Sequence, residues 1–257
     1  MNEPQVISIL SGMSPITLEQ MKDVKLMDRN DLKYVANDSK LEAILSEASQ
    51  HYFVQDASGV RLSTYHTVYY DTPNMTMYLE HHDKRSVRQK IRIRTYVESG
   101  LTFIEIKDKD NKSKTHKHRI QLPSEEIDDA ARAFLEKKAN YTAEQIIPVL
   151  DERFKRITLV SRSMKERLTI DAEITYRNLM TGNSIDLRGL IVLESKTEGG
   201  SVSKARDIFL DMRIRPSNFS KYCIGCSLTD HGLKRNNFKT KLRYLDKLTN
   251  YKYEYAR

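Results

Sequence analysis

The segment 88–109 spaces its positively charged side chains in a way that could grip phosphate. In "RQKIRIRTY", Lys90, Arg92 and Arg94 point one way along a β-strand, and the intervening isoleucines point the other way. Beyond a turn at 98–100, "FIEIKDK" puts Glu105 and Lys107 on one face in the same manner. Guanidinium and ammonium groups together can hold several phosphate oxygens. Taken alone, however, the hairpin is better explained as an exposed lattice of ion pairs that contributes little energy.

The same alternation recurs in other parts of the chain. This repetition favours a shared charged face over an exposed lattice of ion pairs. Candidate strands near 29–34, 117–122, 166–175 and 190–197 each carry charges on one face and aliphatic residues on the other. The acids predicted on the charged face are Asp31, Glu105, Asp171, Glu173 and Glu194. Cations outnumber them, and an unpaired cation in a dry core costs several kcal/mol. The charged face must therefore hold water, counter-charges or an anionic ligand.

Composition points to a polyanionic partner. The 257 residues include 43 Lys and Arg against 35 Asp and Glu, a formal net charge of +8. Such a balance favours nucleotide, polyphosphate, nucleic acid or anionic lipid, without choosing among them. No Gly-x4-Gly-Lys-Ser/Thr loop is present, so phosphate binding by a P-loop is not supported. The length suits one main domain.

Neither a membrane-spanning segment nor a secretory signal is evident, so we expect a soluble, cytoplasmic chain. Cys223 and Cys226 are the only cysteines and form a lone Cys-x-x-Cys. Because no second pair completes a four-ligand zinc site, we predict reduced, partly buried thiols.

The spacing of apolar residues, together with helix-capping residues and prolines, divides the chain into three predicted regions. They are 1–24 with a short lead-in helix at 14–24, a main domain at 25–230, and a basic tail at 231–257. Ser124 is the predicted N-cap of a helix at 124–139, and Pro148 is predicted to bend or end another at 142–152. Further helices are predicted within 38–49, 74–82, 201–212 and 219–228.

Helices inserted between hairpins indicate an α+β fold. We predict a closed antiparallel β-barrel tunnel with a polar, basic lumen and helices packed outside, because closure turns the charged faces of separated strands onto one space. A flat sheet with its charged face in water is the alternative.

An ordered set of short stretches resembles the VTC-type polyphosphate polymerase domain of the triphosphate tunnel metalloenzyme superfamily. The stretches cover residues 25 to 226 and read "RNDLKYV", "VYYDTPNMTMY", "KIRIRTY", "FIEIKDK", "RLTIDAEI", "VLESK" and "FSKYCIG". The resemblance implies a tunnel whose basic interior binds triphosphate with a divalent metal. The first strand reads Arg29-x-Asp31-x-Lys33 where CYTH-type relatives have Glu-x-Glu-x-Lys, which favours the VTC branch and leaves the role of Asp31 open.

The resemblance also implies site residues. Carried over by position, the catalytic cations are Arg92, Arg94, Lys107 and Arg167; the substrate-binding cations are Lys33, Arg119, Lys196 and Lys221. Glu194 falls on the carboxylate that binds Mn²⁺ or Mg²⁺, and hard cations prefer such oxygen ligands.

The function implied is transfer of the terminal phosphoryl of ATP to a growing polyphosphate chain. A tunnel triphosphatase and a non-catalytic polyanion-binding module are the alternatives. ATP and polyphosphate are the expected partners. Nucleic acid is not expected, because a nucleic-acid surface favours exposed basic residues interleaved with stacking aromatics, whereas here the clearest cations lie on strand faces opposite aliphatic residues. The family's eukaryotic members carry membrane spans that this chain lacks, so coupling to translocation would need a separate membrane partner.

Overall fold

The computed structural model describes residues 1–24, 30–112, 114–250 and 252–253. Its β-strands are β1 (Pro15–Thr17), β2 (Asn30–Asn37), β3 (Tyr52–Asp56), β4 (Ser63–Asp71), β5 (Arg88–Tyr96), β6 (Leu101–Lys109), β7 (Thr115–Leu122), β8 (Ile147–Ser161), β9 (Glu166–Asn178), β10 (Ser184–Asp186) and β11 (Leu190–Thr197). Its α-helices are α1 (Glu3–Gly12), α2 (Leu41–Ser49), α3 (Thr76–His82), α4 (Asp129–Lys138), α5 (Lys204–Asp211), α6 (Lys221–Thr229) and α7 (Lys239–Thr249). Short 3₁₀ turns are η1 (Gln20–Asp23), η2 (Asp38–Lys40), η3 (Ala143–Gln145) and η4 (Asn236–Phe238). None of these helices is long and apolar enough to cross a membrane.

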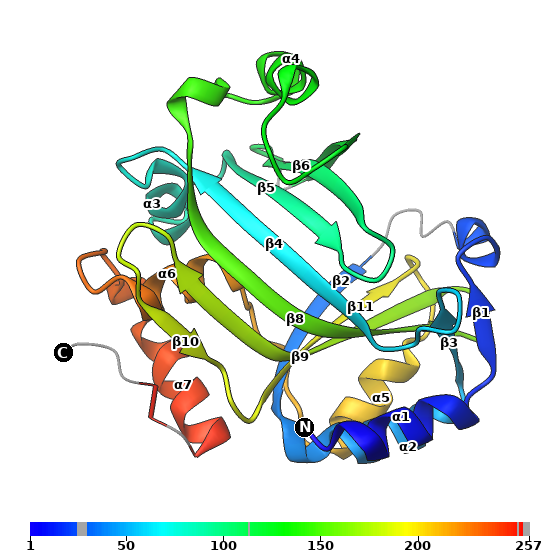
Figure 1. Ribbon diagram of the computed structural model, residues 1–257. Coiled ribbons are helices and arrows are strands. Elements are labelled where there is room, and N and C mark those ends of the chain that lie inside the picture. The colour runs from blue at the N-terminus through cyan, green and yellow to red at the C-terminus, as the bar shows by residue number, and fades with distance from the viewer. Residues whose placement is uncertain (25–29, 113, 251, 254–257) are drawn as a thin grey trace.

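One strongly curved sheet forms the frame of the molecule (Figure 1). Its main path runs β2-β11-β9-β8-β4-β5-β6-β7, and each neighbouring pair is antiparallel. The prediction of an α+β fold with an antiparallel sheet is confirmed.

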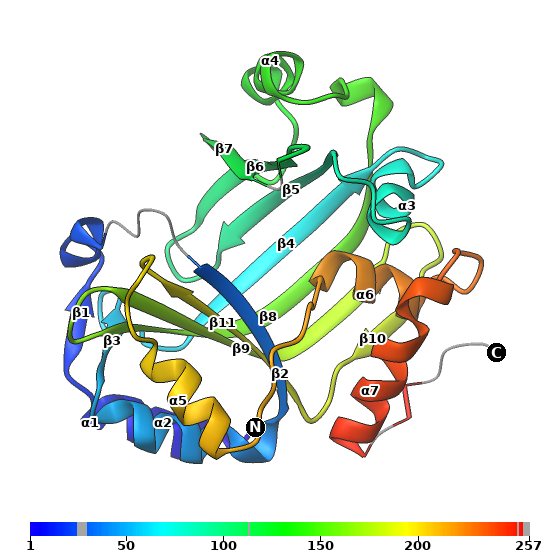
Figure 2. The ribbon, with the colours of Figure 1, turned by 180° about the vertical axis from the view of Figure 1, so that it is seen from behind.

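The prediction of a closed barrel is wrong, because the sheet ends in two separate edges. In the described part of the chain, β2 and β7 do not pair with each other. Residues beside helix α6 occupy the outer edge of β2 instead: the Ser217 amide donates to the Lys33 carbonyl at 2.7 Å, and Tyr34 bridges to Pro216. The result is an open trough with a concave and a convex side (Figure 2).

The convex side of the sheet is covered by helices, as the aliphatic strand faces predicted. Ile157 and Leu159 of β8 lie in a core cluster with residues of α1, α2 and α5. A second cluster packs the isoleucines of β5 and β6 against α4 residues such as Leu135. Because successive side chains of a strand point to opposite faces, these contacts turn Arg92 and Arg94 toward the concave side.

Helices α6 and α7 depart from the predicted outside position. Tyr222 of α6 and Leu245 of α7 share a core cluster with Tyr69 and Phe154 of the sheet. Ring centroids of Tyr69 and Tyr222 lie 5.1 Å apart. The region 231–257, predicted as a basic tail, thus includes helix α7, whose Leu242 and Leu245 are buried.

Four local predictions need correction. The chain begins with α1 at Glu3–Gly12, whereas 14–24 holds β1 and η1. The N-cap of α4 is Asp128, which accepts from the Ala131 amide at 2.8 Å, and not Ser124. The predicted helix at 142–152 is only the turn η3 followed by β8. Pro148 lies where the register of β4 and β8 shifts between Tyr69 and Tyr70, and such an irregularity tolerates a proline.

A bulge in β9 accounts for the fourth correction. The β8–β9 register shifts between Arg153 and Lys155, and Glu173 has a φ of 51°. The extra residue changes which side chains face the trough. Glu173, predicted to face inward, is exposed and lies 3.1 Å from the Nζ of Lys155.

Candidate phosphate-binding site

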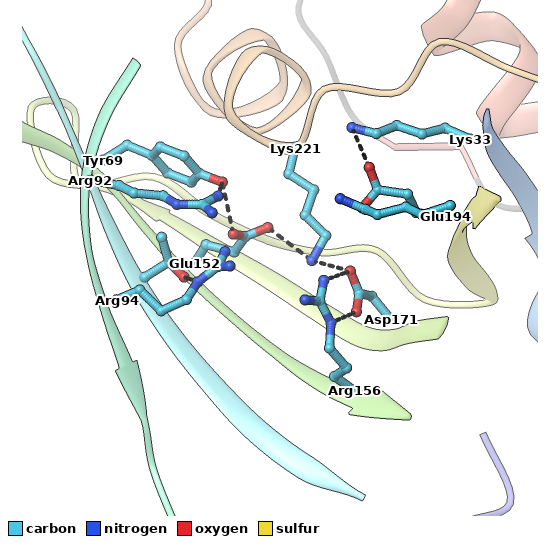
Figure 3. A network of polar contacts seen from close by, with 11 residues as sticks. Lys33, Tyr69, Arg92, Arg94, Glu152, Arg156, Asp171, Glu194 and Lys221 are labelled. Atoms are coloured by element: carbon cyan, nitrogen blue, oxygen red, sulfur yellow. Dashed lines mark hydrogen bonds and ion pairs between the residues drawn. The ribbon is translucent and has the colours of Figure 1, made fainter. Parts of the chain in front are cut away.

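The strand registers bring most of the predicted site residues to the concave face. Glu194 of β11 lies directly opposite Lys33 of β2 on one side and Thr169 of β9 on the other. Across the trough, Arg92 of β5 pairs in register with Glu105 of β6. Side chains from seven elements, β2, β4, β5, β8, β9, β11 and α6, converge there (Figure 3).

Arg92 is fixed by a carboxylate. Its Nε and Nη2 both donate to Oε2 of Glu105, at 2.8 and 2.6 Å. Lys117 also forms an ion pair with Glu105. Burial alone would raise the pKa of Glu105, but the charges of Arg92, Arg94 and Lys117 outweigh it and hold that pKa well below its usual range. Glu105 is therefore a permanently ionised anchor for Arg92.

Arg94 is the most deeply placed of the predicted cations. Its side chain is 6% exposed, and its Nε donates to Thr67 Oγ1 at 3.0 Å. The guanidinium lies 5.5 Å from the ring centroid of Tyr65 and 5.7 Å from that of Phe154. These contacts leave other guanidinium donors of Arg94 for a ligand, and among the described residues no carboxylate forms an ion pair with it.

Helix α6 brings Lys221 into the same space. The helix starts at Lys221, after Ser220 accepts from the Cys223 amide at 3.3 Å as its N-cap. Gly225 lets α6 approach the sheet closely, since a Cβ there would meet Leu150 at 2.6 Å and Tyr176 at 2.8 Å.

Lys221 completes a buried charge cluster at the floor of the trough. Its Nζ lies 2.9 Å from Asp171 Oδ2 and 3.4 Å from Glu152 Oε1. Arg156 binds Asp171 through two hydrogen bonds, at 2.6 and 2.7 Å. Burial opposes ionisation of Asp171, yet Arg156 and Lys221 hold its pKa well below its usual range. Burial lowers the pKa of Lys221 itself.

Glu194 differs from these anchored acids. Its contacts are longer, 3.5 Å to the Nζ of Lys33 and 3.6 Å to that of Lys196. Burial would raise its pKa, but Lys33, Lys196 and Lys107 lower it to about 2. The neighbouring Thr169 has a buried hydroxyl with no hydrogen-bond partner in the described part of the chain. Glu194 is thus an ionised carboxylate next to an unsatisfied hydroxyl.

The donors at Glu194 fit a divalent metal that is shared with a ligand. Among the described residues, no group of three or more His, Cys, Asp or Glu side chains could hold a metal. Mg²⁺ commonly uses one or two carboxylates together with substrate phosphates and water. Glu194 is the carboxylate of the trough least committed to hydrogen bonds, so it is suited to that arrangement.

Lys107 is close to several other cationic side chains. The charge of Arg92, followed by burial and by the charges of Lys196 and Lys33, lowers the pKa of Lys107 to about 6, against the opposing effect of Glu194. Lys107 therefore loses its proton more easily than an ordinary lysine does. The trough thus holds more cationic groups than its acids can neutralise.

Two predicted residues lie nearer the rim. Arg119 of β7 is exposed and stacks 4.7 Å from the ring centroid of Phe103. Arg167 lies opposite Lys196 in the β9–β11 register. Arg29, the first residue of the predicted strand motif, falls outside the described residues.

Cys223 and Cys226 form no disulfide, in line with the prediction, but they are fully buried in α6 and not partly buried. Sequence reasoning missed Arg156, Glu152 and Tyr69. Arg156 carried a usable signal, because it alternates with Ile157 and Leu159 on β8. Glu152 carried none, since it fell in the segment mistaken for a helix.

The family model of the VTC domain matches residues 28–229. The match spans well over half of the sequence, and the chain therefore belongs to the VTC domain family, which confirms the resemblance. No curated protein sequence matches it.

Several solved structures are similar to this chain. A candidate adenylyl cyclase from Hippeastrum, for which a dominant triphosphatase activity is stated, has a TM-score of 0.48 at 14% identity, over 78% of this chain and 96% of that one. Candidate adenylate cyclases from Bacillus halodurans and Vibrio parahaemolyticus have TM-scores of 0.46 and 0.45 at 14% and 13% identity. Each covers 76% of this chain, with 96% and 97% of its own length matched.

Proposed function

We propose that this protein is a polyphosphate polymerase that transfers the terminal phosphoryl of ATP to a growing polyphosphate chain. The observation that carries the proposal is that Arg92 and Arg94 lie on the same concave face as the ionised Glu194, whose charged neighbours include Lys33 and Lys107. Membership in the VTC domain family supports it.

Phosphoryl transfer depends on positioning and charge stabilisation rather than on a covalent intermediate. An oxygen of the chain's terminal phosphate forms a bond to the γ-phosphorus, and the bond from that phosphorus to the β–γ bridging oxygen breaks. ADP leaves, and the chain is one phosphate longer. Arg92 and Arg94, held rigidly by Glu105 and Thr67, would stabilise charge on the transferring group without reorganising.

Glu194 would hold Mn²⁺ or Mg²⁺ together with phosphate oxygens, and Lys33 and Lys196 flank it. The bound metal would neutralise charge on the phosphates. Lys107 and Lys221 would bind further phosphate oxygens, and Arg119, Arg167 and Lys196 would extend this basic surface.

The state of the acids in the trough favours a phosphate acceptor over water. Glu105, Asp171 and Glu194 all have lowered pKa values, so they are weak bases. The amine of Lys107 would gain a proton when phosphates bind. A polyphosphate end is already ionised and needs no base, whereas hydrolysis of triphosphate would require a water to be activated.

The test is incubation with ATP labelled at its γ-phosphate, with Mn²⁺ or Mg²⁺ and with or without a short polyphosphate primer. Label in long chains is expected. Labelled free phosphate would instead identify a triphosphatase, and binding of polyphosphate without turnover would identify a non-catalytic module.

A further inference from the structure

A second group of cations continues along β5 and β6 beyond Arg92. The register places Lys90 directly opposite Lys107, and Arg88 directly opposite Lys109. Like charges at directly opposing positions of an antiparallel pair are destabilising. Within the described residues, none of these four side chains has an ion-pair partner, unlike Arg92 with Glu105. Two cross-strand pairs on this face, called rungs below, therefore consist of basic side chains that have no ion-pair partner among the described residues.

The cations of these rungs also gather around one buried histidine. The end of α3 places His81 where Lys90, Arg88, Lys241 and Lys109, in that order after burial, lower its pKa to about 2. Its Nδ1 is buried and has no hydrogen-bond partner in the part of the chain described. Segments distant in sequence thus bring several positive groups together at this end of the trough.

Lys90 joins this group to the phosphate-binding site. Its Nζ donates to Ser220 Oγ at 2.9 Å, beside the start of helix α6. Burial, with the charges of Lys33, Arg88 and Arg92, lowers its pKa to about 8 against the opposing effect of Cys223. The cationic surface is therefore continuous from Arg92 to Arg88, a distance of about 13 Å for four residues of strand.

We propose that Arg88, Lys90 and Lys109 form a subsite for an inorganic polyphosphate chain that extends out of the transfer site. This inference rests on the proposed function and specifies where the acceptor chain lies. A ligand confined to the transfer site leaves Arg88 and Lys109 without counter-charge, whereas a long chain neutralises them. The two rungs carry no aromatic side chain, so they lack the stacking platform typical of single-stranded nucleic acid sites.

The test compares ligands of different length on a variant with both outer cations removed, Arg88→Gln/Lys109→Gln. Equilibrium binding is measured for inorganic triphosphate and for a long-chain polyphosphate without ATP. We expect the long chain to lose about tenfold or more in affinity while triphosphate affinity is kept. The matched control is Lys137→Gln/Lys138→Gln, which removes the same charge from the exposed surface of α4.

Three results would overturn the subsite: equal losses for triphosphate and long chain, a loss no larger than in the control, or the same loss for a single-stranded oligonucleotide. Thermal unfolding checks the fold, and removal of opposed like charges should leave the free protein no less stable. Lys90→Met provides a second variant with the same expectation.

The outcome is separable from that of the polymerase assay. If the wild-type protein makes no chain but the length-dependent loss appears, the polymerase proposal fails and the subsite stands. If the wild-type protein polymerises, and the Arg88→Gln/Lys109→Gln variant binds long chains as tightly as the wild type, only the subsite proposal is wrong.

Discussion

Lys221 reaches from the first residue of helix α6 to Asp171 of strand β9, with 2.9 Å between Nζ and Oδ2. The same ammonium group lies 3.4 Å from Glu152, and all three side chains are buried or nearly so. One lysine therefore links a helix to the floor of the trough, at the candidate phosphate-binding site.

Replacing Lys221 with Met should destabilise the fold by about 3 kcal/mol or more, because it leaves the buried Glu152 without an ion-pair partner among the described residues and leaves Asp171 with Arg156 alone. Urea denaturation of Lys221→Met measures the loss. Lys204→Met is the control, since Lys204 is exposed and its pair with Asp207 spans 3.7 Å on the surface; an exposed pair of this kind contributes at most about 1 kcal/mol. Equal stabilities for the two variants would contradict the cluster's structural role.

Glu194→Gln should largely abolish metal-dependent turnover while the fold survives, because an amide lacks the charge that lets a hard cation displace water. Loss of that negative charge between Lys33 and Lys196 should also leave metal-free triphosphate binding as tight or tighter. Turnover titrated with Mn²⁺ tests the first point, and calorimetry the second. Glu173→Gln on the outer surface is the control. Unchanged turnover at limiting Mn²⁺ would show that Glu194 is not the metal ligand.

Arg94→Lys should lower kcat by about a hundredfold or more, because an ammonium keeps the charge but not the guanidinium fork that Thr67 orients. Single-turnover transfer at saturating ATP isolates this effect from binding. Arg153→Lys serves for comparison, since Arg153 is 62% exposed and outside the trough. If both variants transfer at the wild-type rate, Arg94 does not stabilise the transferring phosphoryl.

Polyphosphate binding should take up protons through Lys107. Its pKa is about 6 in the free protein, chiefly because of Arg92, and a bound polyanion raises it. Between about pH 6 and the higher pKa of the complex, binding adds protons, so affinity falls as pH rises through that range.

Calorimetry in two buffers of different ionisation enthalpy gives the number of protons taken up. The Lys107→Met variant should take up fewer protons than the wild type, by up to about one proton. Subtracting the two values removes the protons that phosphate itself takes up. Equal uptake by both proteins would exclude Lys107 as the group that titrates.

The β5–β6 hairpin could be predicted from sequence because its alternation is unbroken. Ile91 and Ile104 point to the convex core, and Arg92 and Glu105 therefore point inward. Predictions from this alternation failed where a bulge or a register shift interrupts a strand. The bulge at Glu173 changes the phase of β9, and the shift near Pro148 gives Val149 and Leu150 a spacing that imitates a helix.

Closure of the sheet could not be judged from such local patterns, since it depends on partners distant in sequence. Ser217 and Pro216 contact β2 across more than 180 intervening residues, and no periodicity marks that contact. Lys221 was found through family resemblance only, because helical spacing does not reveal which neighbour a first-turn side chain will meet.

The outer edge of β7, which pairs with no other strand in the described part of the chain, has a consequence for how copies of this chain meet in solution. An exposed strand edge is a template on which another chain can add. Here the edge strand carries Lys117 and Arg119, both exposed. Mutual repulsion between such edges keeps them apart, and salt shortens its reach to about 10 Å at 0.1 M and about 3 Å at 1 M. Dispersal of the protein at high concentration should therefore depend on ionic strength.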